Sequence, residues 1–257
     1  MDLDFLAEIY HAFSSPDTTL LCTVTPTRDE LDTHIVYVHS VIESYPLKKP
    51  LLTLRSKTML HYLHSLRVGT MFSDLMKGEH EILKYLPSQC MVAAGLLHDY
   101  GKIQIPDAIL NKPGSHEPRE REKMKSHNRL TYASAELAEL ERDFFPYLRE
   151  IAILHHPYPR HAHRRKDERR ELNIMEEPGQ RSGQERRGSE RREPNEFVER
   201  AGQLLALCDK YDALCSKRDY KEAFPASQVR EELGKFFANE TEKIEYLVER
   251  YPSPVGE

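Results

Sequence analysis

The stretch from Ser88 to Leu97, SQCMVAAGLL, is apolar on almost every side and leads directly into the pair His98-Asp99. A helix that is apolar all round is stable only when other elements cover it. Gly101 follows at a position where helices commonly end. We therefore expect a central buried helix with a histidine and an aspartate at its end, inside a fold built from helices.

Helical spacing of apolar residues continues on both sides of this segment. It begins at Lys57 and runs through Leu75, which predicts one long helix. Further helices are expected at about Pro118–His127, Leu130–Arg142 and Pro146–His155, from Phe197 onward, and once or twice between Gln228 and Tyr251. The predicted fold class is all-α.

Residues 1–54 are harder to interpret. A helix is expected from Leu3 to Phe13, but LLCTVTP and HIVYVHSVI suit a strand as well as a helix. We expect residues 1–54 to form a small N-terminal accessory segment, with α+β structure left open, and residues 55–257 to form the main helical domain. A chain of 257 residues is long enough for one such core.

The charge of the chain is unevenly distributed. Between Arg160 and Arg192 there are 11 Lys or Arg against 7 Asp or Glu, an excess of 4, so the net charge of −5 leaves about −9 for the rest. This segment has few large apolar residues and repeats ERR, which is typical of a mobile basic insert at about residues 160–195. A net negative chain does not favour binding to a nucleic-acid polymer.

No apolar run approaches the length that crosses a bilayer, and the first residues are acidic rather than basic. We therefore expect a cytoplasmic protein without a membrane segment. The four cysteines show no CxxC spacing and are interpreted as reduced thiols: Cys22, Cys90, Cys208 and Cys215.

Histidines and aspartates recur on separate expected helices. Besides His98-Asp99, the set comprises His64, His127, the doublet His155-His156, and Asp209. Helices in a bundle can bring such side chains to one inner point. Five imidazoles and two carboxylates suit two divalent ions, with Asp99 bridging them through its two oxygens.

Two such ions activate water and stabilise the charge that develops during phosphoester hydrolysis, so a bridging hydroxide is the expected nucleophile. Nitrogen and oxygen ligands without thiolate favour iron or manganese and leave nickel, cobalt and zinc open. The other histidines lack a ligand spacing and are assigned no role: His11, His34, His39, His80, His116, His161 and His163.

Several segments resemble the signature of HD-GYP domains, a branch of the HD superfamily of metal-dependent phosphohydrolases. HDYGKIQIPDAILNKPG is similar to HDxGKxxxPDxILxKPG, and HSLRV to the upstream HSxRV. MKSH, ILHHPYP and CDKYDALCSKRDYKEAF resemble later blocks of the family in the same order. The resemblance covers about residues 57–230.

The resemblance implies a bundle of about five core helices, a di- or trinuclear metal centre and hydrolysis of cyclic di-GMP. It places the histidines and aspartates named above at metal-ligand positions. It also places Lys102, Asp212, Arg218 and Lys221 near substrate phosphate or metal-bound water. Cations bind phosphate with charge-assisted hydrogen bonds, and an aspartate can carry a proton, so Asp99, Lys102 and Asp212 are the expected catalytic residues.

Two departures from the family pattern affect these expectations. Trinuclear members have a glutamate where this chain has Leu60, so we expect two metals. After His156 the family reads ExxDGxGYP, whereas here Pro157-Tyr158-Pro159 follows directly. The loop beside the site is therefore rebuilt, which leaves the substrate open.

The leading hypothesis is a phosphodiesterase that opens cyclic di-GMP. The first alternative is a phosphohydrolase for another nucleotide or phosphoester. The second is a signalling module that binds metal or nucleotide without turnover and reaches a partner protein through residues 1–54 or the basic insert. The sequence does not indicate an oligomeric state.

Overall fold

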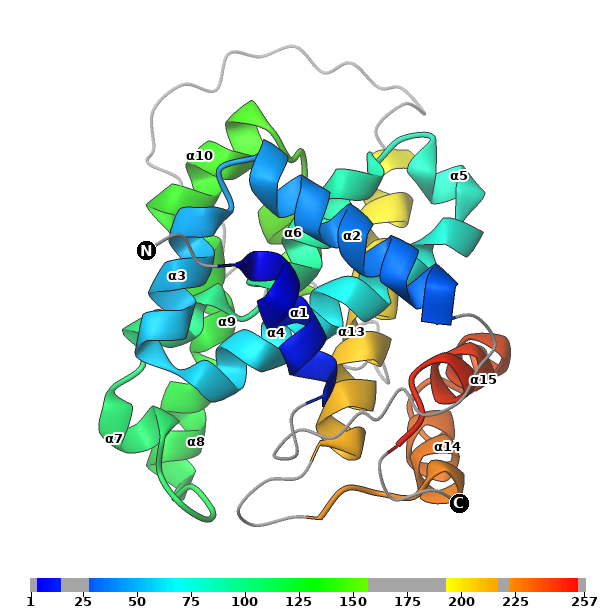
Figure 1. Ribbon diagram of the computed structural model, residues 1–257. Helices are drawn as coiled ribbons and strands as arrows, with labels where there is room; N and C mark the ends of the chain where they lie inside the picture. The colour runs from blue at the N-terminus through cyan, green and yellow to red at the C-terminus, as the bar shows by residue number, and fades with distance from the viewer. Residues whose placement is uncertain (1–3, 15–27, 157–192, 217–221, 254–257) are drawn as a thin grey trace.

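A computed structural model describes residues 4–14, 28–156, 193–216 and 222–253 of the chain. The described part contains helices and no strands (Figure 1). In order they are α1 (Phe5–Ser14), α2 (Arg28–Ser44), α3 (Lys48–Lys57), α4 (Met59–Leu75), η2 (Met76–Gly78), α5 (His80–Leu83), α6 (Ser88–Leu97), η3 (Tyr100–Gln104), α7 (Asp107–Leu110), α8 (Pro118–Lys125), α9 (His127–Tyr132), α10 (Ala135–Asp143), α11 (Leu148–Ile153), α13 (Glu193–Cys215), α14 (Ala226–Gly234) and α15 (Thr241–Arg250).

The all-α expectation is confirmed. HIVYVHSVI lies inside α2, so the strand alternative for it was wrong. Its apolar residues Ile35, Val38, Val41 and Ile42 follow a helical repeat and are all buried, which explains the outcome. LLCTVTP, Cys22 and the basic insert up to residue 192 lie outside the described residues.

The crossing of α4 and α6 forms the centre of the molecule. A Cβ atom on Gly95 would lie only 2.6 Å from the Cα atom of Gly69, so the two backbones approach each other closely. From Cys90 to Leu97 every residue of α6 is buried, as its all-round apolar sequence predicts. This crossing holds the end of α6 beside the middle of α4.

The N-terminal helices share the main core. Phe5 and Ile9 of α1 and Ile35 of α2 belong to the same cluster of buried side chains as Leu66 of α4. Figure 1 shows α1 lying against α4, with α2 alongside. The expected boundary between residues 54 and 55 falls inside α3, so the described part of residues 1–54 is packed onto the helices that follow.

The middle of the chain differs from the expected helices in one respect. Instead of a continuous helix from Leu130, α9 ends at Tyr132 and α10 starts after Ser134. The Ser134 side chain accepts a hydrogen bond from the Leu137 backbone N–H, which is the N-cap arrangement that starts a new helix. The turn separates the helix that begins with His127 from α10.

Cys90, Cys208 and Cys215 are buried, and none of them forms a disulfide within the described residues. Burial raises the pKa of Cys90 to about 12, so this thiol is unreactive. Within the described residues, none of the helices combines the length and the apolar character needed to cross a membrane.

Candidate metal centre

Five helices bring the expected ligand residues together. His64 lies in α4, His127 is the first residue of α9, and Asp209 lies in α13. The other members follow the ends of α6 and α11: His98, Asp99, His155 and His156. Most of the set is buried, and only His156 and Asp209 are partly exposed.

One group, which we call the first half-site, consists of His64, His98 and Asp209 around the Oδ2 atom of Asp99. The Nε2 atom of His64 lies 3.2 Å from Asp209 Oδ1 and 3.6 Å from Asp99 Oδ2. His98 Nε2 lies 3.4 Å from the same Asp99 oxygen. The three ligand atoms of the group fall within 4.8 Å of one another.

The second half-site consists of His127, His155 and His156 around the other oxygen of Asp99. His127 Nε2 lies 3.1 Å from Asp99 Oδ1, and His155 Nε2 lies 3.6 Å from it. His156 Nε2 lies 3.1 Å from His127 Nε2. Each Asp99 oxygen thus faces a different group of imidazoles, which is the arrangement of a bridging carboxylate.

Backbone carbonyls fix the protonation of three imidazoles. The Nδ1 atoms of His98 and His127 donate to the carbonyl oxygens of Gly95 at 2.8 Å and Met124 at 2.5 Å, and His155 Nδ1 donates to Ala152. Because a carbonyl oxygen only accepts, Nδ1 carries a proton, and Nε2 is the nitrogen that can offer a lone pair to a metal. Each Nε2 faces the cluster, as in metal sites where a second hydrogen bond orients the ligand.

These lone pairs fit a cation. His98 Nε2 is buried and has no hydrogen-bond partner among the described residues. The Nε2 atoms of His127 and His155 lie 3.5 Å apart, while the Nδ1 atoms of both rings donate to backbone carbonyls. Neutral imidazoles with converging lone pairs are the donor set of a divalent transition metal.

The carboxylates of the cluster are held in the ionised form. Burial alone would raise the pKa of Asp99, but Lys102, His98 and His127 outweigh it and hold the pKa well below its usual value. Burial is likewise outweighed at Asp209, where His64 keeps the pKa low. Burial and the neighbouring His155 and His127 lower the pKa of His156 to about 3. Ionised carboxylates and a neutral imidazole are the forms that bind a metal.

Lys102 lies at the edge of the first half-site. Its Nζ atom donates to Asp99 Oδ2 at 2.5 Å and lies 3.1 Å from His61 Nδ1. Leu60, the residue before His61, is 49% exposed, and its side chain carries no ligand atom. His61 was assigned no role from the sequence, although it contacts Lys102 in the structure.

Asp212 lies behind the cluster rather than beside its centre. Its Oδ2 atom is 2.7 Å from His64 Nδ1, and its Oδ1 atom accepts from Arg67 Nε at 2.5 Å. Both oxygens are therefore occupied on the side of His64 that faces away from Asp99. The expected proton-carrying role of Asp212 stays a prediction. Arg218 and Lys221 lie outside the described residues.

Arg67 belongs to the HSLRV segment but was assigned no role from the sequence. It is 1% exposed although it carries a full charge, and it lies on the same helix as His64. A charged residue within the apolar stretch LRVGTMF of a helix was the signal for it.

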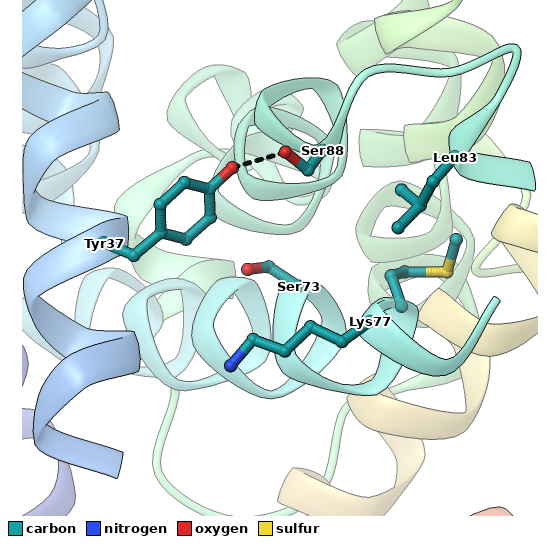
Figure 2. Close-up of a pocket in the computed structure, with 6 residues that line it drawn as sticks. Tyr37, Ser73, Lys77, Leu83 and Ser88 are labelled. Atoms are coloured by element: carbon teal, nitrogen blue, oxygen red, sulfur yellow. Dashed lines mark hydrogen bonds between the residues drawn. The ribbon is translucent and has the colours of Figure 1, made fainter. Parts of the chain in front are cut away.

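A small pocket lies elsewhere between the helices. It has a volume of about 240 Å³ and is lined by Tyr37, Ser73, Met76, Lys77, Leu83 and Ser88. Figure 2 shows Tyr37 on one side of the pocket with its hydroxyl hydrogen-bonded to Ser88 Oγ at 2.7 Å. None of the lining residues belongs to the two half-sites, so the metal-binding chemistry is separate from this pocket.

The fold and the site define the class of protein: a helical bundle with clustered histidines and a His-Asp pair at its centre. Comparisons with known proteins agree with this class. The family model described as "HD domain" matches residues 62–214. A protein of Vibrio cholerae serotype O1 named 3'3'-cGAMP-specific phosphodiesterase 2 is 30% identical over 62% of this chain and 26% of its own length. A cyclic di-GMP phosphodiesterase of Thermotoga maritima is 31% identical over 72% of this chain and 43% of its own length.

A further Vibrio cholerae protein, named cyclic di-GMP phosphodiesterase, is 34% identical over 50% of this chain and 22% of its own length. The chain thus matches less than half the length of each of these relatives. It belongs to the HD domain family, and its motifs together with these relatives make it a member of the HD-GYP branch. Membership in this family implies divalent metal binding, which agrees with the clustered histidines and aspartates.

Proposed function

We propose that the chain is a metal-dependent phosphodiesterase that opens cyclic di-GMP. The observation that carries the proposal is the position of Asp99, whose two oxygens face two separate groups of imidazoles. Such a carboxylate supports two neighbouring divalent ions. Relatives whose names include cyclic di-GMP phosphodiesterase support the choice of substrate.

The two half-sites would hold one ion each. His64, His98 and Asp209 would bind the first, His127, His155 and His156 the second, and Asp99 both. When bound, two divalent ions supply the Lewis acidity and the activated water that phosphodiester hydrolysis needs. The ligand set favours iron or manganese, and nickel, cobalt and zinc complete the panel to be tested.

The protein's own residues would bind and orient the substrate. The side chain of Lys102 is 12% exposed and its ammonium lies beside Asp99, so a phosphate that approaches the half-sites would meet this cation. We assign Lys102 to phosphate binding, and we keep Arg218 and Lys221 as substrate-binding proposals on the motif resemblance alone. The neutral His156 and the ionised Asp209 lie on the more exposed side of the cluster.

A direct test uses pure protein loaded in turn with each metal of the panel and incubated with cyclic di-GMP. Chromatography should show the linear dinucleotide or GMP. The Asp99→Asn variant should lose at least about 100-fold in turnover because it lacks the shared ligand. Asp74→Asn, which alters a buried aspartate on α4 outside the cluster, is the matched control. Absence of turnover with every metal would rule out this substrate.

A second substrate also has support, because one relative is named a 3'3'-cGAMP-specific phosphodiesterase. The same assay with equal amounts of cyclic di-GMP and 3'3'-cGAMP measures the preference directly. A chain that binds either nucleotide in calorimetry but releases no product would instead be a signalling module without turnover.

A further inference from the structure

Arg67 connects the N-terminal helix to a metal-facing histidine. Its guanidinium is buried, with 1% of the residue exposed. The Nε and Nη2 atoms donate to the two oxygens of Asp212 at 2.5 and 2.9 Å, which is a bidentate pair. A buried arginine without partners would be strongly destabilising, so this geometry is needed for the fold.

Asp212 transmits the position of Arg67 to His64. Its Oδ2 atom lies 2.7 Å from His64 Nδ1, so it accepts the proton of that nitrogen and leaves Nε2 directed at Asp99 and Asp209. The Ser216 hydroxyl also lies 3.3 Å from the same Asp212 oxygen. His64 differs in this respect from His98, His127 and His155, each of which is oriented by the backbone carbonyl three residues earlier in the chain.

The third partner of Arg67 comes from α1. The Nη1 atom donates to the backbone carbonyl of Ala12 at 3.2 Å. Ala12 lies in the last turn of α1, where carbonyl groups lack partners within the helix and where the helix dipole favours a cation. Phe5, Ile9 and Phe13 hold α1 in place through their burial in the main core.

We propose that α1 positions the first half-site through Ala12, Arg67 and Asp212, which makes Arg67 and Asp212 positioning residues for His64. The inference rests on the metal centre proposed above. It assigns the N-terminal helix a role in metal binding at one half-site and none at the other. His127, His155 and His156 make no contact with this connection in the described residues.

The test is a calorimetric titration of metal-free protein with Mn²⁺ alone. The wild type should bind two ions. Asp212→Asn and Arg67→Lys should lower the affinity for one Mn²⁺ ion by about 10- to 100-fold, the usual effect of removing a residue that orients a ligand. The affinity for the other ion should stay unchanged. Arg67→Lys keeps the charge and removes the bidentate geometry, so it tests orientation rather than charge.

The control is Asp74→Asn, which removes a buried carboxylate of α4 that accepts from the hydroxyls of Tyr246 and Tyr251. It should lower the melting temperature and leave both Mn²⁺ affinities unchanged. A second pair of variants distinguishes an effect of α1 on the first half-site from a general loss of stability. Ile9→Ala in α1 should lower the affinity for the same Mn²⁺ ion as Asp212→Asn does. Leu233→Ala in α14, an equally buried position, should not lower it.

A double-mutant cycle identifies the affected half-site. In the His64→Ala background, Asp212→Asn should cause no further loss of Mn²⁺ binding. In the His127→Ala background, it should remove most of the Mn²⁺ binding that remains. The inference would be overturned, while the metal centre stands, by an equal loss of affinity for both ions. Unchanged affinities in folded Asp212→Asn and Arg67→Lys would overturn it as well. A wild type that binds fewer than two Mn²⁺ ions would overturn both.

Discussion

Among the acidic residues that the structure describes, Asp99 differs in the number of cationic or imidazole groups that face it. Lys102, His64 and His98 approach one of its oxygens, and His127 and His155 approach the other. Lys102 shares the oxygen that faces the first half-site, so it lies where a substrate phosphate and a metal would both come close. Its contribution can be separated from metal binding.

Replacement of Lys102 by Ala should reduce turnover by about 10- to 100-fold, because a charge-assisted hydrogen bond to phosphate contributes about 1.5–3 kcal/mol. The metal content should stay unchanged. Steady-state kinetics and metal analysis of the same preparation measure both quantities. Lys77→Ala is the matched control, since Lys77 forms the same type of pair with Asp74 three residues earlier. Loss of metal from Lys102→Ala would show that Lys102 supports the ligands instead.

At the scale of elements, the ligand residues stand where helices end or begin. His98 and Asp99 follow α6, and His127 opens α9. Gly101 was expected where the buried helix ends, and a glycine there often has a left-handed conformation. In the described residues, however, only Gly114 among the glycines has a positive φ. Gly101 is instead required for contact, because a Cβ atom there would lie 2.1 Å from the carbonyl oxygen of His127.

The Gly101→Ala variant should therefore displace α9 and with it His127. We expect a loss of about 1–3 kcal/mol in the free energy of unfolding, typical of overpacking, and weaker binding of the ion at the second half-site. Denaturant titration and Mn²⁺ calorimetry measure the two effects. Gly234→Ala is the control because a Cβ atom there meets nothing within 4 Å. A Gly101→Ala protein as stable as the wild type would contradict the close contact.

The sequence predicts elements better than it predicts their partners. The periodicity of α4 and the all-apolar run of α6 identify these helices, and the spacing of histidines anticipates the cluster. Arg67 and Asp212, however, are 145 residues apart, and no local pattern predicts that they meet. The same limit applies to α2, where β-branched residues suited a strand until packing against the core decided for a helix.

At the scale of the whole molecule, the N-terminal and C-terminal helices meet on α4. His34 of α2 is buried beside Asp74 of α4, and its Nε2 atom lies 3.1 Å from the Thr70 carbonyl oxygen. Asp74 also accepts from Tyr251 beyond the end of α15. Burial lowers the pKa of His34 from 6.5 to about 4, although the charge of Asp74 opposes this shift.

Because the pKa of His34 is lower in the folded state, the unfolded chain binds the proton first as the pH falls. The stabilising contribution of neutral His34 is complete above about pH 6.5 and is lost progressively between about pH 6.5 and 4. The loss should reach about 3 kcal/mol. Denaturant titrations of wild type and His34→Gln across this range, both free of metal, should converge as the pH falls. A constant difference between the two proteins would contradict the burial of a neutral His34.

The central claim is that Asp99 joins two metal ions in one hydrolytic site. The most direct measurement is the metal content and the cyclic di-GMP turnover of wild type and Asp99→Ala, prepared and loaded identically. The account predicts about two ions per chain and product formation for the wild type, and loss of both ions and of turnover for the variant. Retention of two ions by Asp99→Ala would contradict the bridging role of this carboxylate.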